Sequence, residues 1–205
     1  GLHSYGHQLI WQQTRDEFRQ DLLRNIGILE DQLGYKVDKY RAPGFSIKRS
    51  NLWAFEVLAE TGIQTDASIF PALRAHGGMP SFPYNYPCLV ERNGITIKEF
   101  PTNYINLAGI RTVLTGGGYF RFWPYSVIRH FTKNAPYVMT YFHPRDFDLG
   151  QPVLSDFGPF RRFRAYYGLK SSQSKLEQWI REFNFTDLRT AEASIDWATA
   201  PVARF

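Results

Sequence analysis

Two histidines near the start of the chain, His3 and His7, have the side-chain type and the spacing of a metal site. Neutral imidazoles are the commonest protein ligands of divalent transition metals. A separation of four residues predicts that both rings lie on one side of a helical turn and bind the same ion. Because a catalytic zinc ion takes a third protein ligand and a water, other residues must complete the site.

Three further polar residues follow segments that are expected to be strands, namely Arg41, Asp66 and His143. In α/β folds, catalytic groups gather at the carboxyl ends of parallel strands, so we expect these residues to lie near the histidine pair. His143 follows the apolar stretch 136–142 and is either a general acid or a core histidine bound to a backbone carbonyl. Arg41 either holds a carboxylate in a fork geometry or is a surface arginine. Asp66 either orients an imidazole beside the metal or caps a turn.

Several other motifs exclude reaction classes. The glycine run 116–118 is not followed by the Lys-Ser/Thr pair of a phosphate-binding loop, and we expect it to let the backbone pass close to a wall or a ligand. No serine stands in a Gly-x-Ser-x-Gly elbow, which argues against a serine hydrolase. The single cysteine, Cys88, excludes an intramolecular disulfide and is expected to be a buried small hydrophobe in a strand.

The chain carries a formal net charge of +5, most of it scattered along the sequence. In one basic cluster, Arg161, Arg162 and Arg164 are interleaved with Phe160 and Phe163. This cluster suits phosphates or an acidic glycan, and it is too short to predict nucleic-acid binding. No apolar run approaches the length of a membrane span.

The elements that must position these residues alternate between helices and strands, which is typical of α/β folds with a parallel sheet. Thr14 and Glu17 form a capping box, and Gly34 ends the helix that follows it. Asn93-Gly94 is the signal of a two-residue hairpin turn. The expected elements are a helix over 14–33, a strand over 37–41, a helix from Ser50 or Asn51 to Gly62, a strand over 63–66, and a hairpin of 89–92 and 95–98.

The second half of the chain is expected to contain helices and one strand. Pro124 suits the first position of a helix, and the apolar stretch 136–142 is expected to be a strand that delivers His143 at its end. A final helix over 172–183 is expected to bury Leu176, Trp179, Ile180 and Phe183. A length of 205 residues suffices for one domain. The chain begins without a methionine or a leader pattern, so we expect it to be N-terminally incomplete.

Taken together, these segments resemble the polysaccharide deacetylase family with the NodB homology domain, in its branch associated with bacterial exopolysaccharide loci. Residues 163–167 are similar to part of the C-terminal extension of that branch, which here covers about 144–205. Five segments carry the resemblance in the family's order: the metal motif 3–7 (HSYGH), the arginine motif 40–46 (YRAPGFS), and the segments 66–71 (DASIFP), 116–121 (GGGYFR) and 141–144 (YFHP).

The resemblance implies a distorted (β/α) barrel of the NodB type over 1–205, without its first strand or strands and with an added β-hairpin. It implies that His3 and His7 bind a divalent metal, with Zn²⁺ as the favoured ion. The third metal ligand and the general base are implied to be aspartates upstream of Gly1. The implied catalytic residues are His143, Arg41 and Asp66, and the implied substrate-binding residues are Pro43, Gly44, Phe45, Tyr119 and Arg121.

The implied activity is metal-assisted removal of N-acetyl groups from amino sugars of a bacterial polysaccharide. Zinc would polarise the acetyl carbonyl, an upstream aspartate held by Arg41 would take a proton from water, and His143 would protonate the leaving amine. The implied partner is an N-acetylated glycan, without nucleic acid or a membrane span, and the cytoplasm is favoured over the cell envelope. Where this branch carries Trp and Glu after His-Pro, the chain has Arg145 and Asp146, a difference that affects substrate contacts.

Two other functions stay open at this point. One is a catalytically inactive carbohydrate-binding domain of the deacetylase type, favoured by the missing aspartates and the high aromatic content. The other is a deacylase of a nucleotide- or lipid-linked amino sugar, whose phosphate would meet the basic cluster at 160–164. An upstream aspartate pair together with acetate release would exclude the first, and equal hydrolysis of charged and neutral glycans would remove the support for the second.

Overall fold

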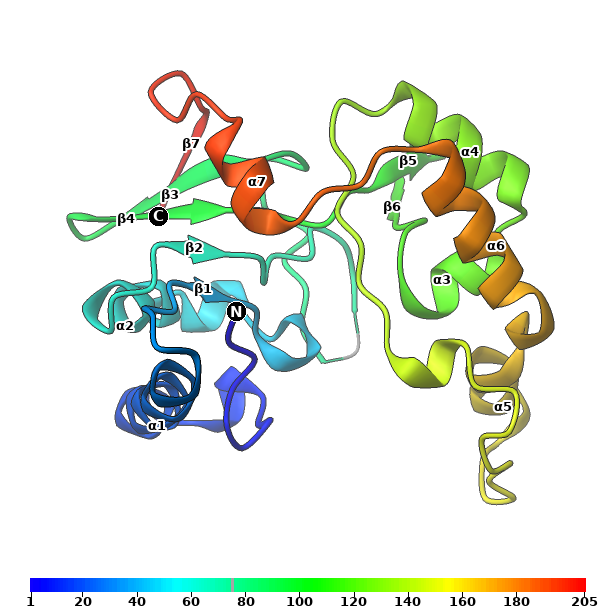
Figure 1. The fold of residues 1–205 in the computed structure, drawn as a ribbon, viewed down its shortest axis with the longest axis horizontal. Helices are drawn as coiled ribbons and strands as arrows, with labels where there is room; N and C mark the ends of the chain where they lie inside the picture. The colour runs from blue at the N-terminus through cyan, green and yellow to red at the C-terminus, as the bar shows by residue number, and fades with distance from the viewer. Residues whose placement is uncertain (75) are drawn as a thin grey trace. The chain divides into compact units, whose positions relative to one another are not determined.

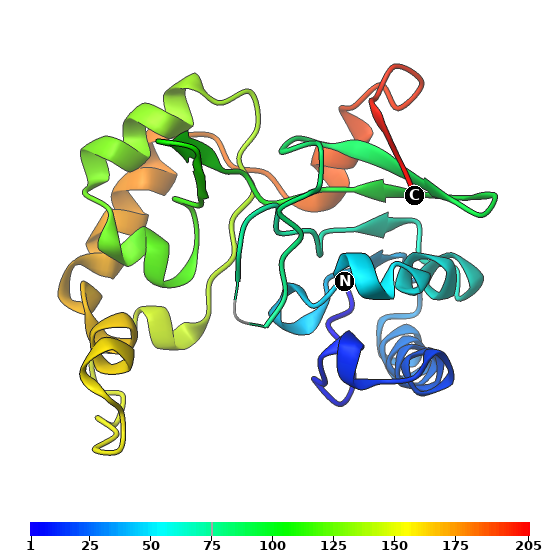
Figure 2. The ribbon, with the colours of Figure 1, turned by 180° about the vertical axis from the view of Figure 1, so that it is seen from behind.

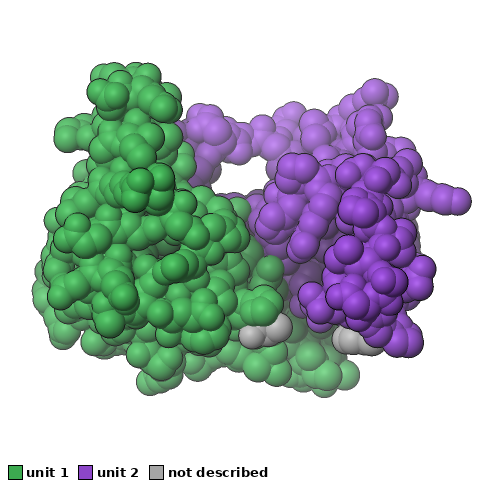
Figure 3. All heavy atoms as spheres, turned by 90° about the horizontal axis from the view of Figure 1, so that it is seen from below, with its two compact units in different colours: residues 1–112, 196–205 green, residues 113–195 purple. Residues whose placement is uncertain are grey.

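The computed structural model describes residues 1–74 and 76–205, and of Phe160 it describes the backbone. The chain divides into two units, which Figure 3 shows in different colours. Unit 1 comprises Gly1–Thr112 and Asp196–Phe205, and unit 2 comprises Val113–Ile195. None of the helices in the described ranges is both long and apolar enough to cross a membrane.

A mixed sheet forms the centre of unit 1 (Figure 1). β1, β2 and β4 run parallel to one another, β3 is antiparallel to β4, and β7 is parallel to β3. Leu2 adds a parallel bridge to Tyr40 beside β1. The parallel strands therefore end at one side of the sheet, which we call the carboxyl edge. The strands, in spatial order, are β1 (Lys39–Tyr40), β2 (Thr65–Asp66), β4 (Ile95–Glu99), β3 (Cys88–Arg92) and β7 (Val202–Arg204).

Two helices lie side by side next to this sheet, α1 (Arg15–Leu33) and α2 (Trp53–Glu60) (Figures 1 and 2). The capping box of α1 is confirmed, because Thr14 accepts from the Glu17 amide and Glu17 accepts from the Thr14 amide at 2.7 Å. Gly34 ends α1 with a φ of 72°, as predicted.

The predicted cap of α2 is wrong. Asn51 accepts from the Lys48 amide at 2.6 Å and so stabilises the 3₁₀ turn Arg49–Asn51 that precedes α2, while Leu52 occupies the cap position of the helix itself. Asparagine side chains often bond to nearby backbone amides, and Asn51 does so in the 3₁₀ turn and not at the start of α2. The sequence signal therefore indicated a helical turn at this place, while α2 itself begins two residues after Asn51.

The hairpin of β3 and β4 is confirmed. Asn93 and Gly94 have φ values of 46° and 82°, and two positive φ angles are what the tightest hairpin turn requires. A second hairpin, β5 (Ile105–Leu107) and β6 (Ile110–Thr112), was not predicted. It turns at Ala108 and Gly109, also with positive φ, and alanine gives little signal for such a turn.

Three helices of unit 2 share a small core, to which α3 contributes Phe120, α4 Ile128 and α6 Trp179. α3 and α6 lie side by side (Figure 2). The helix predicted to begin at Pro124 is confirmed as α4, with Pro124 at the position before its first residue. The helices are α3 (Gly117–Phe122), α4 (Tyr125–Asn134), α5 (Pro159–Tyr166), α6 (Leu169–Glu182) and α7 (Leu188–Ala193).

Two predictions for this part of the chain are wrong. Residues 136–142 do not form a strand. The carbonyls of Met139 and Tyr141 accept hydrogen bonds from Thr115 and Gly117, so a loop and a helix start occupy the place of a strand ladder. Ile180 is 55% exposed, because α6 turns Trp179 into the core and the next residue lies about 100° around the helix.

The predicted α/β class is confirmed by the mixed, parallel-rich sheet of unit 1. Closure of that sheet into a barrel is not shown by its strand order, in which β1 and β7 stand at the two ends. The assignment of 1–205 to a single deacetylase-like domain with an extension at 144–205 stays a prediction.

Candidate active site

His3 and His7 lie close together in a loop of unit 1, with ring centroids 5.1 Å apart and ring planes at 70°. The predicted convergence is present, but the predicted helical turn is wrong. Ser4 and His7 have positive φ values of 66° and 52°, and these bends bring the rings together. Both histidines are exposed to solvent, as ligands of an exchangeable ion would be.

The loop is held by the N-terminal half of α1. Asp21 accepts hydrogen bonds from the amides of Tyr5 and Gly6, at 3.0 and 2.7 Å. Arg24, one turn further on, donates to the Tyr5 hydroxyl at 2.8 Å, and its guanidinium lies 3.8 Å from the centroid of that ring. The sequence analysis missed Asp21, because its role depends on the loop folding back onto the helix.

The hydrogen bond of His3 determines which of its nitrogens can bind a metal. Nδ1 donates to the Arg41 carbonyl oxygen at 2.7 Å, because a carbonyl can only accept. Nε2 is then the nitrogen with the lone pair, which is the arrangement of a histidine ligand oriented by its second nitrogen. Ser4, between the two histidines, has a buried hydroxyl oxygen that makes no hydrogen bond within the described residues.

The two imidazoles therefore fit part of a zinc ligand set. Within residues 1–74 and 76–205, no group of three or more His, Cys, Asp or Glu side chains converges on one point. His3 and His7 are thus the residues of the described chain that would hold the ion together with a further ligand.

Arg41 links three segments at the carboxyl edge of the sheet. Its amide donates to the Leu2 carbonyl at 3.0 Å, and its Nε donates to the Ala67 carbonyl at 3.0 Å. Its own carbonyl holds His3. The segments that follow Leu2, β1 and β2 are therefore joined to one another through this arginine, as the strand-end argument predicted for Arg41 and Asp66. His143 belongs to unit 2, and its expected proximity to the histidine pair stays a prediction.

Asp66 and Glu99 are fully buried neighbours on β2 and β4. Burial raises the pKa of Glu99 well above its ordinary value, and the adjacent Asp66 carboxylate raises it further. Burial also raises the pKa of Asp66, although hydrogen bonds with Glu99 and Ser68 act in the opposite direction. Both carboxyl groups therefore bind a proton more tightly in the folded protein than free acids do.

The Asp66 carboxylate acts on the arginine segment through Ser68. The Ser68 hydroxyl donates to Asp66 at 2.5 Å and accepts from the Ala42 amide at 2.7 Å. Glu99 in turn accepts from the Ile69 amide at 3.0 Å. The buried acids thus hold the backbone amides of Ser68 and Ile69. Through the Ser68 hydroxyl, Asp66 also holds the amide of Ala42, which is the residue after Arg41.

Glu99 was missed by the sequence analysis, although a signal was present. Ile95, Ile97 and Glu99 alternate along β4, so all three point to the same face of the strand. Ile97 and Glu99 are buried on that face. An acid that continues the apolar side of a strand indicates a functional or paired carboxylate, because an unpaired buried charge is costly.

The predicted substrate-binding turn Pro43–Phe45 begins two residues after Arg41 and is largely buried. Pro43 and Phe45 are buried, and Gly44 has a φ of 62°. A Cβ atom at Gly44 would lie 2.8 Å from a Leu9 methyl carbon, which would have to shift, and the positive φ is strained for any other residue. This turn forms a rigid support for the arginine, and its contact with a substrate stays a prediction.

In unit 2, His143 is paired with Asp146 at the 3₁₀ turn Pro144–Asp146. The His143 amide donates to Asp146 Oδ2 at 3.0 Å, and His143 Nδ1 lies 3.6 Å from the same oxygen. Arg121 Nε lies 3.4 Å from Asp146 Oδ1. The His143 side chain is 50% exposed, whereas the Asp146 side chain is 4% exposed.

Charge and hydrogen bonds compete at Asp146. Burial acts to raise the pKa of Asp146, but the backbone hydrogen bond from His143, the nearby His143 ring and the charge of Arg121 outweigh it. The pKa of Asp146 therefore lies below its ordinary value, and the group is a carboxylate that orients His143. Asp146 is one of the two positions where the chain differs from the pattern of the family that it resembles.

Tyr119 and Arg121, the other predicted substrate residues, belong to α3. The glycine run lets the start of α3 pass close to Tyr141, as expected, because a Cβ at Gly116 would lie 2.5 Å from the Tyr141 carbonyl oxygen. Tyr119 is half-buried. Arg121 is 6% exposed and donates to the carbonyls of Arg164, Ala165 and Tyr167, so it clamps the end of α5.

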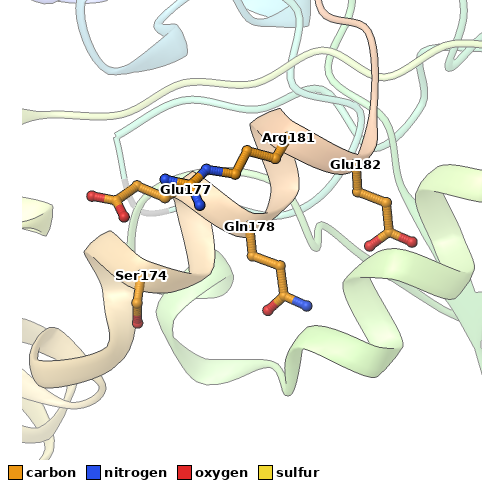
Figure 4. A pocket seen from close by; sticks show the side chains of 5 residues that line it. All are labelled: Ser174, Glu177, Gln178, Arg181 and Glu182. Atoms are coloured by element: carbon orange, nitrogen blue, oxygen red, sulfur yellow. The ribbon is translucent and has the colours of Figure 1, made fainter.

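A separate surface pocket of about 340 Å³ runs along α6 (Figure 4). Its lining residues are Ser174, Glu177, Gln178, Arg181 and Glu182. None of the predicted site residues lines it, and its carboxylates and arginine come from successive turns of one exposed helix. We therefore assign no catalytic or binding role to this pocket.

Comparison with solved structures finds two proteins with a similar fold. A candidate polysaccharide deacetylase from Mycobacterium smegmatis matches with a TM-score of 0.50 and 17% identity, over 88% of this chain and 54% of that chain. A 4-alpha-glucanotransferase from Thermococcus litoralis matches with a TM-score of 0.57 and 12% identity, over 99% of this chain and 29% of that chain. The chain thus spans about half the length of the first structure and under a third of the second.

At these identities the matches establish a shared fold, and at that level the resemblance to the polysaccharide deacetylases is confirmed. No curated protein matches the sequence. A protein family model matches residues 67–193, which is more than half of the chain. The matched range begins directly after Asp66 and includes α3 and His143. The chain therefore belongs to the family described as "Domain of unknown function (DUF3473)".

Proposed function

We propose that this chain is part of a metal-dependent hydrolase that removes N-acetyl groups from the amino sugars of a bacterial polysaccharide. The observation that carries the proposal is the pair of imidazoles His3 and His7, 5.1 Å apart, with His3 oriented by the Arg41 carbonyl at the carboxyl edge of the sheet. The deacetylase-type fold supports it. Under this proposal the sheet of unit 1 is part of the distorted barrel of that fold.

When bound by His3 and His7, zinc would supply a Lewis acid for the acetyl carbonyl and lower the pKa of the attacking water. The third ligand and the general base are proposed to be aspartates that precede the 205 residues, as the family resemblance implies. Arg41 would orient the general base, since its position is fixed by the Leu2 and Ala67 carbonyls. Asp66 and Glu99 would act as positioning residues behind Arg41.

His143 would supply the proton that the leaving group needs. Hydrolysis adds the water oxygen to the acetyl carbon, breaks the C–N bond and leaves acetate and a sugar amine, whose nitrogen takes up a proton. A general acid must therefore be a donor with a fixed direction. Asp146 supplies that direction, since it holds the amide of His143 and lies beside its Nδ1.

The test uses the full-length protein, including any residues that precede Gly1. Acetate release from N-acetylglucosamine oligosaccharides is measured after dialysis against a chelator and after addition of Zn²⁺, with bound metal measured in parallel. His3→Ala and His7→Ala should each lower metal content and reduce acetate release by about 10²-fold or more. His130→Ala, an exposed histidine on α4, is the matched control. A protein that binds no divalent metal, or that stays active in both variants, contradicts the proposal.

A second candidate function is a carbohydrate-binding domain without catalysis. It is favoured by exposed aromatic rings in unit 2, among them Phe122, Phe163 and Tyr167. Glycan binding without acetate release in the presence of Zn²⁺ would support this second function. Acetate release that depends on His3 and His7 would exclude it.

A further inference from the structure

Three exposed aromatic rings gather in unit 2, which we call the aromatic platform. Phe122 ends α3, Phe163 lies on α5 and Tyr167 follows α5, and they are 49%, 46% and 48% exposed. The centroids of Phe163 and Tyr167 are 4.6 Å apart, and Phe122 lies 6.4 Å and 5.9 Å from them. Aromatic rings that are clustered yet half exposed mark a surface that binds something.

The platform is rigid because its two helices are joined by a buried clamp. Arg121, next to Phe122 on α3, donates to the carbonyls of Arg164, Ala165 and Tyr167 at 2.8 to 3.1 Å. Gly168 has a φ of 74°, and a Cβ there would lie 2.5 Å from the Arg121 carbonyl oxygen. The three rings are therefore preorganised, which lowers the conformational entropy that the protein loses when a ligand binds.

Positive charge flanks the rings. Phe163 and Tyr167 are four residues apart and share one face, whereas Arg162 and Arg164 lie about 100° to either side of Phe163 on the helix. Arg161 lies on the opposite face by the same geometry. Residues 157–176 contain no aspartate or glutamate, so the stretch of sequence around the platform is basic.

We propose that the aromatic platform and the flanking Arg162 and Arg164 bind an anionic polysaccharide. The flat, apolar faces of sugar rings can stack on Phe163 and Tyr167, and guanidinium groups pair with carboxylates in a fork geometry. A row of rings bordered by cations thus matches a chain of sugars bordered by carboxylates. The inference deepens the proposed function, on which it rests for the choice of a glycan, by naming the class of glycan.

The test measures binding and does not depend on catalysis. The full-length protein is titrated calorimetrically with polygalacturonate, in which every sugar carries a carboxylate, and with neutral dextran. We expect polygalacturonate to bind and its affinity to fall with added salt. The double variants Phe163→Ala/Tyr167→Ala and Arg162→Gln/Arg164→Gln should each bind about tenfold more weakly or worse. Circular dichroism verifies that each variant is folded.

Arg161→Gln is the matched control, because it removes the same charge from the other face of α5, and it should retain wild-type affinity. The proposal is overturned if polygalacturonate does not bind, or if folded double variants bind it as wild type does. It is also overturned if the protein binds phosphatidylglycerol vesicles and not polygalacturonate, or if the platform variants abolish a dimer seen by sedimentation. Polygalacturonate binding without acetate release would leave this inference standing and contradict the deacetylase proposal.

Discussion

The carboxylate of Asp146 holds His143 at two points. Its Oδ2 accepts the His143 amide at 3.0 Å and lies 3.6 Å from Nδ1 of the same residue. The other oxygen lies 3.4 Å from Arg121, so the carboxylate is fixed from behind by a buried cation. A half-exposed histidine thus gains a defined direction from a residue only three positions further along the chain.

Replacing this carboxylate should affect kcat more than KM. In Asp146→Asn, His143 loses a charged partner while the shape of the site is kept, so we expect kcat for acetate release to fall about tenfold or more. Steady-state kinetics on the full-length protein check this. Asp156→Asn, an exposed acid in the same unit, serves as the control and should leave kcat unchanged. An equal effect of both substitutions would show that Asp146 has no special role.

The same substitution should change how stability depends on pH. Because the pKa of Asp146 is lowered in the folded protein, its ionised form stabilises the fold above the ordinary pKa of an aspartate. That contribution is lost as the pH falls through the lowered pKa. We expect Asp146→Asn to be less stable than wild type at about pH 7 and the difference to shrink in strong acid. Urea unfolding across this range measures it, and a difference that is constant with pH would contradict the assignment.

The Asp66–Glu99 pair should show the opposite dependence. Both pKa values are raised, so the folded protein binds more protons than the unfolded chain between the ordinary and the raised values. Stability then falls as the pH rises through that window. Glu99→Gln removes the Glu99 part of this slope, and its stability relative to wild type should increase from about pH 5 to pH 9. A stability difference that does not vary over this range, measured by denaturant unfolding, would refute the raised pKa of Glu99.

The loop that carries the histidines should depend on Asp21. In Asp21→Ala the amides of Tyr5 and Gly6 lose their acceptors, and we expect the zinc affinity of the full-length protein to fall about tenfold. Asp16→Ala is the matched control, because Asp16 lies on the same helix with its side chain 87% exposed. Competition with a chromophoric chelator measures the affinity. Equal affinities in the two variants would show that α1 does not hold the loop.

The turn behind Arg41 should reject any side chain at Gly44. Gly44→Ala combines a positive φ with a Cβ 2.8 Å from Leu9, and we expect a loss of about 1–3 kcal/mol in the free energy of unfolding. Gly27, inside α1, has open space around it, so Gly27→Ala should instead stabilise the protein by about 0.5–1 kcal/mol. Thermal and urea unfolding compare the two. Similar effects of both substitutions would remove the argument for a strained turn.

Local signals in the sequence were sufficient for elements whose causes are local. The capping box at Thr14 and the turn at Asn93-Gly94 depend on hydrogen bonds and φ angles within a few residues, and both form as predicted. The strand expected over 136–142 failed for the opposite reason. An apolar run predicts burial, but whether it becomes a strand depends on a neighbouring strand, and here Thr115 and Gly117 take up its carbonyls.

The same difference between local and long-range causes applies to the candidate site. His3 was predicted from its spacing with His7, and Arg41 and Asp66 were predicted from strand-end positions, which can be recognised in the sequence. Hydrogen bonds at the carboxyl edge link the segments that carry these residues. Asp21 and Glu99 were missed, since each acts on a segment far away in the sequence, at Tyr5 and at Ile69. Of these two residues, only Glu99 could have been recognised from the sequence, because it lies on the apolar side of its strand.

The pairing of β7 with β3 sets an order in which the molecule can be completed during synthesis. β7 consists of Val202–Arg204, and its partner β3 of Cys88–Arg92, with the whole of unit 2 between them in the chain. Unit 2 is continuous in sequence and can fold as soon as it leaves the ribosome, because domains fold as units. The sheet of unit 1 stays one strand short until Val202–Arg204, which follow unit 2 in the chain, have been synthesised, and β3 has a free edge until that point.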